Sequence, residues 1–280
     1  MQEHQKADAK TQGANRPTIP AGTYYFVVLP QTFTKGFTIE AYQAGNATDK
    51  PNYTRAFDGK ITLPRSRVLN VGEMAPDPFN GHDYVDLGIE VDGYKVLWAT
   101  MNVGATTPEG YGDYFAWGET APKTDYSWDN YAWGTSSALT KYTATDGKTV
   151  LDLDDDAAHV KWGGDWVMPT VAECEALCDN TTNAWTTNYN GTGINGFLFT
   201  STKDTSKSIF LPAAGYCMGT NKMAASSTGI YLSSSFKVEE TGEHSYALNF
   251  SNSYGGNLQP TYANYRNYGR SVRPVIRMAK

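Results

Sequence analysis

Residues 154–178 constrain the fold most, because they contain the two strong helix signals of the chain. Thr170 lies three residues before Glu173, so its hydroxyl can accept the Glu173 backbone N–H while the Glu173 carboxylate accepts the N–H of Thr170. Pro169 stops a helix from entering this point from the N-terminal side. This capping box predicts a helix from Val171 to about Asp179.

One face of this helix is expected to lie on a hydrophobic core. Cys174, Leu177 and Cys178 are spaced at i, i+3 and i+4, which places them on the same face. Glu173 and Glu175 are expected to turn away from that face, as they would on a surface helix.

A second, shorter helix is predicted just upstream. The aspartates at 154–156 supply an N-cap and a negative charge that favours the positive end of the helix dipole. The helix is expected to run through Ala157, Ala158 and Val160 and to end at Gly163. Almost all of the remaining chain has the pattern of strands and turns, so the predicted fold class is α+β and β-rich.

Strand patterns fall on both sides of a proline-containing segment. TYYFVVLP at 23–30 and GFTIEAYQ at 36–43 have the apolar or alternating pattern of strands. Three dipeptides are typical of short hairpin turns: Asp58-Gly59, Asp92-Gly93 and Asn195-Gly196. Residues 111–133 form a long aromatic connection, for which core packing is favoured over a sugar-binding platform.

Two folded domains are predicted. Residues 1–16 are polar and lack periodicity, so a disordered tail is expected there. Residues 74–82 contain two prolines and no periodicity, and are interpreted as a linker. A β domain at 17–73 and a second domain at 83–280 follow from these boundaries.

Charge and composition limit the partners. The net charge of −6 argues against nucleic acid, because no cluster of Lys and Arg could replace counterions along a phosphate backbone. No apolar run is long enough to predict a transmembrane segment. The N-terminus has no apolar signal-peptide region, so a signal sequence is expected to be absent from this chain. The three cysteines do not form a disulfide framework.

Ordered motifs in the second half resemble the Fibrobacter succinogenes major paralogous domain, which is common in surface proteins of gut Bacteroidetes. They are YVDLG (84–88), LWATMNVGA (97–105), YGDYFAWGE (111–119), WGGDWVMPTVAE (162–173), IFLPAAGY (209–216) and GRSVRPV (269–275). The resemblance covers about residues 83–277. It implies a C-type-lectin-like fold with two short helices, related to formylglycine-generating enzymes, and it implies no activity by itself.

The first domain resembles the C-terminal part of a fimbrillin-like domain, the β-sandwich pilus subunit of the same bacteria. The resemblance rests on PAGTYYFVVLPQTFTKGFTI, a short strand pair and RVLNVG. The matching segment, 17–73, is too short for a whole sandwich. Either the chain is a fragment, or the missing strands come from another segment or subunit, and a partial fimbrillin-like β-sandwich is expected.

Metal and catalytic chemistry find little support. Asp152, Asp154 and Asp156 match the first EF-hand ligand positions, but Ala157 and Gly163 replace the required Gly and Glu. The tripeptides with which C-type lectins bind sugar through calcium are absent. Formylglycine-generating enzymes need a late pair of cysteines, whereas Cys217 has no second cysteine after it and is expected to lack a nearby basic partner. No catalytic residue, metal site or cofactor is therefore predicted.

The predicted binding segment is 245–270, which contains five Asn, five Tyr and three Ser. Tyr offers large rigid contact area, and small polar residues offer adaptable hydrogen bonds, as in antibody paratopes. The segment also resembles the variable region of proteins diversified by retroelements. We expect one exposed face, within or beside a shallow groove, built from Asn252, Tyr254, Asn257, Tyr262, Asn264, Tyr265, Asn267 and Tyr268. Leu248, Phe250, Val272 and Val275 should hold the flanking strands in the core.

These features predict an adhesin-like binding protein, exported to the cell surface, at the outer membrane or a pilus tip. The expected partner is a protein or glycan on a host, bacterial or phage surface, together with other pilus subunits. A formylglycine-generating-type enzyme and a structural spacer of a surface assembly stay open as alternatives.

Helix capping explains the aspartates at 152–156, so folding should not depend on calcium. We expect the melting temperature to be the same with and without EDTA, measured by differential scanning fluorimetry. A drop of several degrees in EDTA that calcium reverses would show this prediction wrong.

Overall fold

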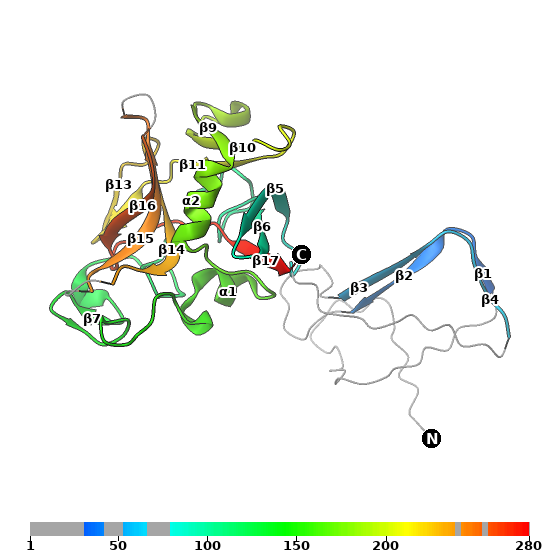
Figure 1. Ribbon diagram of the computed structural model, residues 1–280, viewed down its shortest axis with the longest axis horizontal. Coiled ribbons are helices and arrows are strands. Elements are labelled where there is room, and N and C mark those ends of the chain that lie inside the picture. Colours follow the sequence, from blue (N-terminus) through cyan, green and yellow to red (C-terminus); the bar gives the residue numbers. More distant parts are fainter. Residues whose placement is uncertain (1–30, 42–52, 66–78, 239–241, 254–256, 280) are drawn as a thin grey trace, which may run out of the picture. The chain divides into compact units, whose positions relative to one another are not determined.

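The computed structural model divides into two compact units, Met1–Gly81 and His82–Lys280, each described separately (Figure 1). The described residues are 31–41, 53–65, 79–238, 242–253 and 257–279. They are β-rich and include two α-helices, α1 (Ala157–Trp162) and α2 (Val171–Asp179), which confirms the predicted α+β class. Within these ranges no helix has the length and apolar character needed to cross a membrane. The predicted tail at 1–16 and strand at 23–30 lie outside the described residues.

The first unit contains a bent antiparallel ribbon of four strands. They are β1 (Gln31–Phe33), β2 (Gly36–Ala41), β3 (Tyr53–Asp58) and β4 (Ile61–Leu63). The predicted strand at 36–43 is confirmed over β2. The predicted hairpin turn at Asp58-Gly59 is wrong, because β3 pairs with β2 while β4 pairs with β1. Gly59, with φ of +83°, bends one arm of the ribbon instead of reversing it.

Three antiparallel sheets of three strands each form most of the second unit. In spatial order they are β5 (Tyr84–Val91), β6 (Tyr94–Ala99) and β17 (Val275–Ala279); β9 (Thr181–Thr186), β10 (Gly196–Ser201) and β11 (Ser208–Pro212); and β14 (Thr228–Phe236), β15 (His244–Ser251) and β16 (Asn257–Tyr265). The first sheet is ordered β17-β6-β5, so the last strand of the unit pairs with one of its first two.

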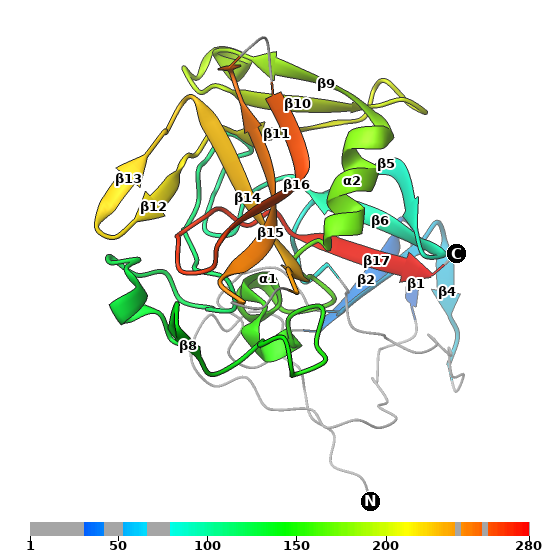
Figure 2. The ribbon, with the colours of Figure 1, turned by 60° about the vertical axis from the view of Figure 1, so that its left-hand side comes forward.

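Smaller elements complete the second unit. They are the paired strands β7 (Gly134–Thr135) and β8 (Ala138–Leu139), the hairpin of β12 (Tyr216–Met218) and β13 (Asn221–Met223), and the 3-10 turns η1 (Trp128–Asn130), η2 (Leu153–Asp155) and η3 (Tyr189–Gly191). Helix α2 packs against β5, β9, β14, β15 and β16 (Figure 2). The main core therefore lies between this helix and the three sheets. Its buried residues include Trp98, Leu177, Phe199, Leu211 and Phe250.

The capping box of α2 is confirmed. The Thr170 hydroxyl accepts the Glu173 N–H at 3.2 Å, and Glu173 Oε2 accepts the Thr170 N–H at 2.7 Å. The expectation that Glu173 turns to solvent is wrong, because its side chain is buried and pairs with Arg277 of β17. Arg277 Nε and Nη2 donate to the two carboxylate oxygens at 2.5 and 2.9 Å. Burial alone would lower the pKa of Arg277. The hydrogen bonds that it donates to Glu173 and the charge of that carboxylate have the larger combined effect, so the pKa is raised.

The predicted cap of α1 is also confirmed, and it falls on Asp156. One carboxylate oxygen accepts the N–H groups of Ala158 at 2.9 Å and His159 at 3.0 Å. The other accepts the N–H of Met168 at 2.8 Å, so the same carboxylate ties α1 to the segment that leads into α2. The helix ends at Gly163, as expected.

The two remaining turn predictions differ in outcome. Asp92-Gly93 joins β5 to β6 as a two-residue hairpin with positive φ at both positions, as predicted. Asn195-Gly196 is not a turn, because the residues between β9 and β10 form a longer loop and Gly196 is already part of β10. A Cβ at Gly196 would lie 2.2 Å from the Leu211 carbonyl oxygen, so close strand packing explains this glycine.

Replacing Asp156 by Ala should lower the free energy of unfolding by about 3 kcal/mol, because it removes a helix cap and leaves the buried Met168 N–H unpaired. Asp154→Ala is the control, since Asp154 is exposed in the same run of aspartates, and should cost less than about 0.5 kcal/mol. Urea unfolding measures both. Equal losses in the two variants would contradict the assignment of the cap.

Candidate functional site

The predicted binding segment contains most of β15, the edge strand β16 and the loop 266–270. The four residues expected to anchor it, Leu248, Phe250, Val272 and Val275, are fully buried, which confirms that prediction. Leu258 of β16 faces Phe250 of β15 in the strand register and packs against the main core. The segment is therefore attached to the core on one side of the sheet.

The predicted site residues differ in exposure. Asn252, Asn257 and Tyr265 are exposed, and Tyr262, Asn264 and Tyr268 are half-buried. Tyr254 lies outside the described residues. Asn267 is 2% exposed, so the expectation that it belongs to an exposed face is wrong. Its Nδ2 donates to the Tyr126 carbonyl oxygen at 2.7 Å, which makes it a structural residue.

The structure also separates the predicted residues into two groups. Asn257 is the first residue of β16 and pairs with Ser251, near Asn252. Tyr265 is the last residue of the same strand, roughly 25 Å away at the usual rise of a β-strand. Tyr265 contacts Tyr268, with 5.6 Å between ring centres. The group at the Tyr265 end also includes Asn264, whose Nδ2 donates to the Tyr262 hydroxyl at 3.2 Å.

Tyr265 and Tyr268 belong to an aromatic cluster that also contains Trp128, Tyr216 and His244. Ring centres lie 6.3 Å apart for Trp128 and Tyr265, 4.7 Å for His244 and Tyr265, and 5.8 Å for Tyr216 and Tyr268. Their surfaces are partly open, since Tyr265 is 38% exposed and the other four are half-buried. Figure 2 shows the strands β12, β15 and β16 that contribute to it.

Sequence reasoning missed three members of this cluster. Trp128 lies in the aromatic connection for which core packing was expected, and that expectation holds for Trp117, which is fully buried. Trp128 is only half-buried and reaches Tyr265. Tyr216 and His244 carry no local signal, because only the pairing of distant segments brings them beside Tyr268 and Tyr265.

Arg270 lies beside this cluster and is completely buried. Its Nη2 donates to the Tyr265 carbonyl oxygen at 2.6 Å, and its guanidinium carbon lies 5.8 Å from the centre of the Tyr268 ring. Its Nε and Nη1 have no hydrogen-bond partner among the described residues. Burial lowers the pKa of Arg270 to about 10, with an opposing influence from nearby tyrosines such as Tyr262 and Tyr268.

Cys217 was the residue on which an enzymatic alternative depended. Contrary to expectation it has a basic neighbour, because it pairs with Lys222 across the β12–β13 hairpin. Burial nevertheless raises the pKa of the Cys217 thiol, and Lys222 only partly opposes this effect. Cys174 and Cys178 are free thiols, and burial raises their pKa values as well, that of Cys178 to about 12. None of these environments favours a thiolate.

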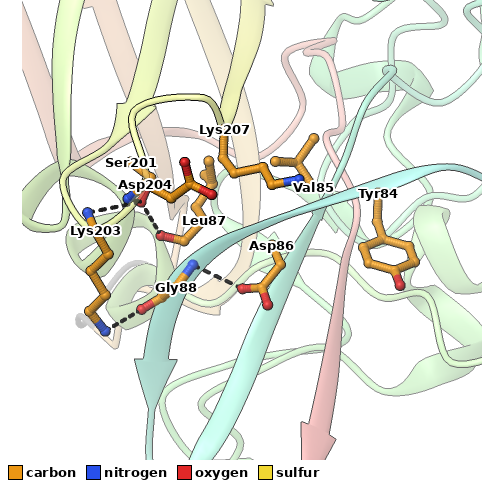
Figure 3. A pocket seen from close by; sticks show the side chains of 9 residues that line it. All are labelled: Tyr84, Val85, Asp86, Leu87, Gly88, Ser201, Lys203, Asp204 and Lys207. Atoms are coloured by element: carbon orange, nitrogen blue, oxygen red, sulfur yellow. Dashed lines mark hydrogen bonds between the residues drawn. The ribbon is translucent and has the colours of Figure 1, made fainter.

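A separate pocket of about 580 Å³ opens beside β5 (Figure 3). Most of its polar groups already bond within the protein. Ser201 donates to the Leu87 carbonyl oxygen at 2.7 Å, Lys203 donates to the Gly88 carbonyl oxygen at 2.6 Å, and Asp86 accepts from Lys95 at 2.9 Å. These bonds stabilise the irregular part of β5 and leave few groups to orient a ligand.

Among the described residues, no three His, Cys, Asp or Glu side chains lie close enough together to hold a metal ion.

Comparisons of the chain with protein-family models, with curated proteins and with solved structures found no match.

Asn267→Ala should lower the free energy of unfolding by about 1–2 kcal/mol, because the buried Tyr126 carbonyl loses its donor. The loss should be near 1 kcal/mol, because the substitution also removes Asn267 Oδ1, a buried oxygen that has no hydrogen-bond partner among the described residues. Asn257→Ala, on the exposed end of β16, is the control and should cost less than about 0.5 kcal/mol. Chemical unfolding compares them, and a neutral Asn267→Ala would return Asn267 to the surface group.

Proposed function

We propose that this protein binds a ligand through the aromatic cluster and the polar residues beside it. The observation that carries the proposal is the meeting of five partly open aromatic side chains from segments distant in sequence. Large rings with polar edges lose little conformational entropy on binding and dominate many interfaces. The surrounding fold brings these rings together before a ligand arrives.

The ordered motifs support a C-type-lectin-like fold for the second unit, whose two helices lie where their capping residues predict them. The resemblance of 17–73 to part of a fimbrillin-like domain supports attachment to a surface assembly. The proposal is therefore an exported, adhesin-like protein at the cell surface or a pilus tip. Its partner is a protein or glycan on a host, bacterial or phage surface.

Diversification of the binding segment is part of the proposal, in a narrower form than the sequence suggested. Residues that can vary without harm to the fold are those with exposed side chains, such as Asn252, Asn257 and Tyr265. Asn267 is excluded from this set because its amide bonds inside the protein. An enzymatic role through Cys217 lacks support, because burial raises the thiol pKa.

A double variant, Tyr265→Ala with Tyr268→Ala, should weaken ligand binding by about 2 kcal/mol or more, since central aromatic residues of an interface contribute most of its affinity. The matched control is Tyr84→Ala with Tyr94→Ala, which removes two exposed tyrosines of β5 and β6 and also alters the pocket beside β5. Binding of the labelled proteins to arrayed glycans, glycoproteins and whole cells gives the comparison. Loss of binding in the control pair alone would move the site to β5.

A further inference from the structure

Three arginines, Arg266, Arg270 and Arg273, are fully buried near the C-terminus, and in two of them every side-chain nitrogen has an acceptor. Arg266 donates to the Tyr131 hydroxyl and to the carbonyl oxygens of Lys141, Tyr142 and Gly242, at 2.9–3.1 Å. Arg273 donates to Asn102 Oδ1 and to the carbonyl oxygens of Ala99, Thr100 and Phe210, at 2.9–3.2 Å. Both guanidinium groups are thus explained as parts of the fold.

Arg270 is different, because its side chain makes one hydrogen bond to the described residues, from Nη2 to the Tyr265 carbonyl oxygen. Nε and Nη1 together carry three N–H groups, and neither nitrogen has an acceptor among the described residues. The ionisable groups that act most strongly on its charge are tyrosines and include no carboxylate. Burying a charged group is costly when most of its N–H groups have no acceptor. The fold alone therefore does not account for the side chain of Arg270.

The position of Arg270 connects it to the proposed binding surface. Its guanidinium lies beside the ring of Tyr268, which stacks on Tyr216 and contacts Tyr265. Tyr268 is half-buried, and access of a ligand to Arg270 requires a change in its rotamer, which side chains at a surface make rapidly. A ligand that displaces this ring would therefore meet both the guanidinium of Arg270 and the neighbouring rings of the cluster.

We propose that the ligand is a glycan with a carboxylated sugar, and that Arg270 binds the sugar carboxylate while the aromatic cluster stacks on the sugar ring. This inference rests on the proposed function and names its ligand class. Charge-assisted bonds from a guanidinium to a carboxylate are about twice as strong as neutral ones, and a dry site strengthens them further. Aromatic rings suit the C–H face of a sugar, and the nearby Tyr262 and Asn264 suit its hydroxyl groups.

An acidic peptide fits this site less well. A peptide usually adds to an exposed sheet edge as an extra strand, using the main-chain donors and acceptors of that edge. β16 is the edge strand here, but Pro260 in its middle has no N–H to donate. The strand register between β15 and β16 is also irregular next to Pro260. The ring-lined surface with a single cationic anchor therefore favours a sugar.

The test measures binding of four oligosaccharide probes that share one neutral core. Two end in a carboxylated sugar, a sialic acid or a glucuronic acid, and two are the same compounds with the carboxyl group reduced to an alcohol. Isothermal titration calorimetry with the full chain should give at least about 30-fold weaker binding after reduction. Comparison of the sialic acid probe with the glucuronic acid probe shows which carboxylated sugar the protein prefers. A glutamate-rich peptide is the fifth probe.

Arg270→Met should reduce the affinity for the acidic probe to that for its reduced form, with the melting temperature unchanged or raised, because an unpaired buried charge is removed. Arg273→Met is the contrast and should lower the melting temperature, because four hydrogen bonds are lost. Should Arg270→Met fail to fold, the comparison of acidic and reduced probes on the unmodified protein still decides the question.

The inference is overturned if acidic and reduced probes bind equally, if neither acidic sugar binds at millimolar concentration, or if only the peptide binds. The proposed function can stand while the inference fails. In that case at least one probe binds, and its affinity falls in the Tyr265→Ala and Tyr268→Ala double variant. Its affinity is the same after reduction of the carboxyl group and in the Arg270→Met variant. Should every probe that binds do so without need of Tyr265 and Tyr268, both proposals fail.

Discussion

The buried guanidinium of Arg273 is the interaction on which the rest of the second unit depends. It joins the end of β6 to β11 through the carbonyl oxygens of Ala99 and Phe210, and it orients the side chain of Asn102. Asn102 in turn donates to the Tyr231 hydroxyl of β14 at 3.2 Å, so all three main sheets meet at this network. Burial lowers the pKa of Arg273 to about 10, but four hydrogen bonds, with at least one acceptor for each nitrogen, stabilise the charge.

This network fixes the backbone from which the proposed binding surface projects. Between Arg266 and Arg273 every residue except Tyr268 is buried. Asn267 turns inward to Tyr126, whereas Tyr268 reaches Tyr216 and Tyr265. The rings are therefore positioned by buried neighbours in the same short segment, which limits the entropy that a ligand must remove on binding.

Helix caps and one hairpin turn could be predicted from the sequence, whereas two turns at Asp58-Gly59 and Asn195-Gly196 and the long-range partners could not. The caps of both helices and the Asp92-Gly93 turn depend on residues a few positions apart, and all three were confirmed. The burial of Glu173 and Asn267 depends on Arg277 and Tyr126, which are 104 and 141 positions away. Their side chains look like surface residues until those partners are known. The aromatic cluster is hidden for the same reason, since Trp128 and Tyr265 carry no shared local pattern.

Three buried arginines within eight residues differ in what holds them: Arg266 and Arg273 are bonded by the fold, whereas Arg270 is proposed to bind a ligand. Arg266 and Arg273 have acceptors that the fold supplies, so a change at either position acts first on stability. Arg270 has donors that the fold leaves unpaired, so its retention costs stability unless a ligand supplies the acceptor. A binding protein tolerates such a cost where the charge determines which ligand is accepted, because a ligand without the matching carboxylate leaves the donors unpaired. In the proposed binding mode, the specificity of the surface therefore depends on the buried charge of Arg270 more than on the exposed rings.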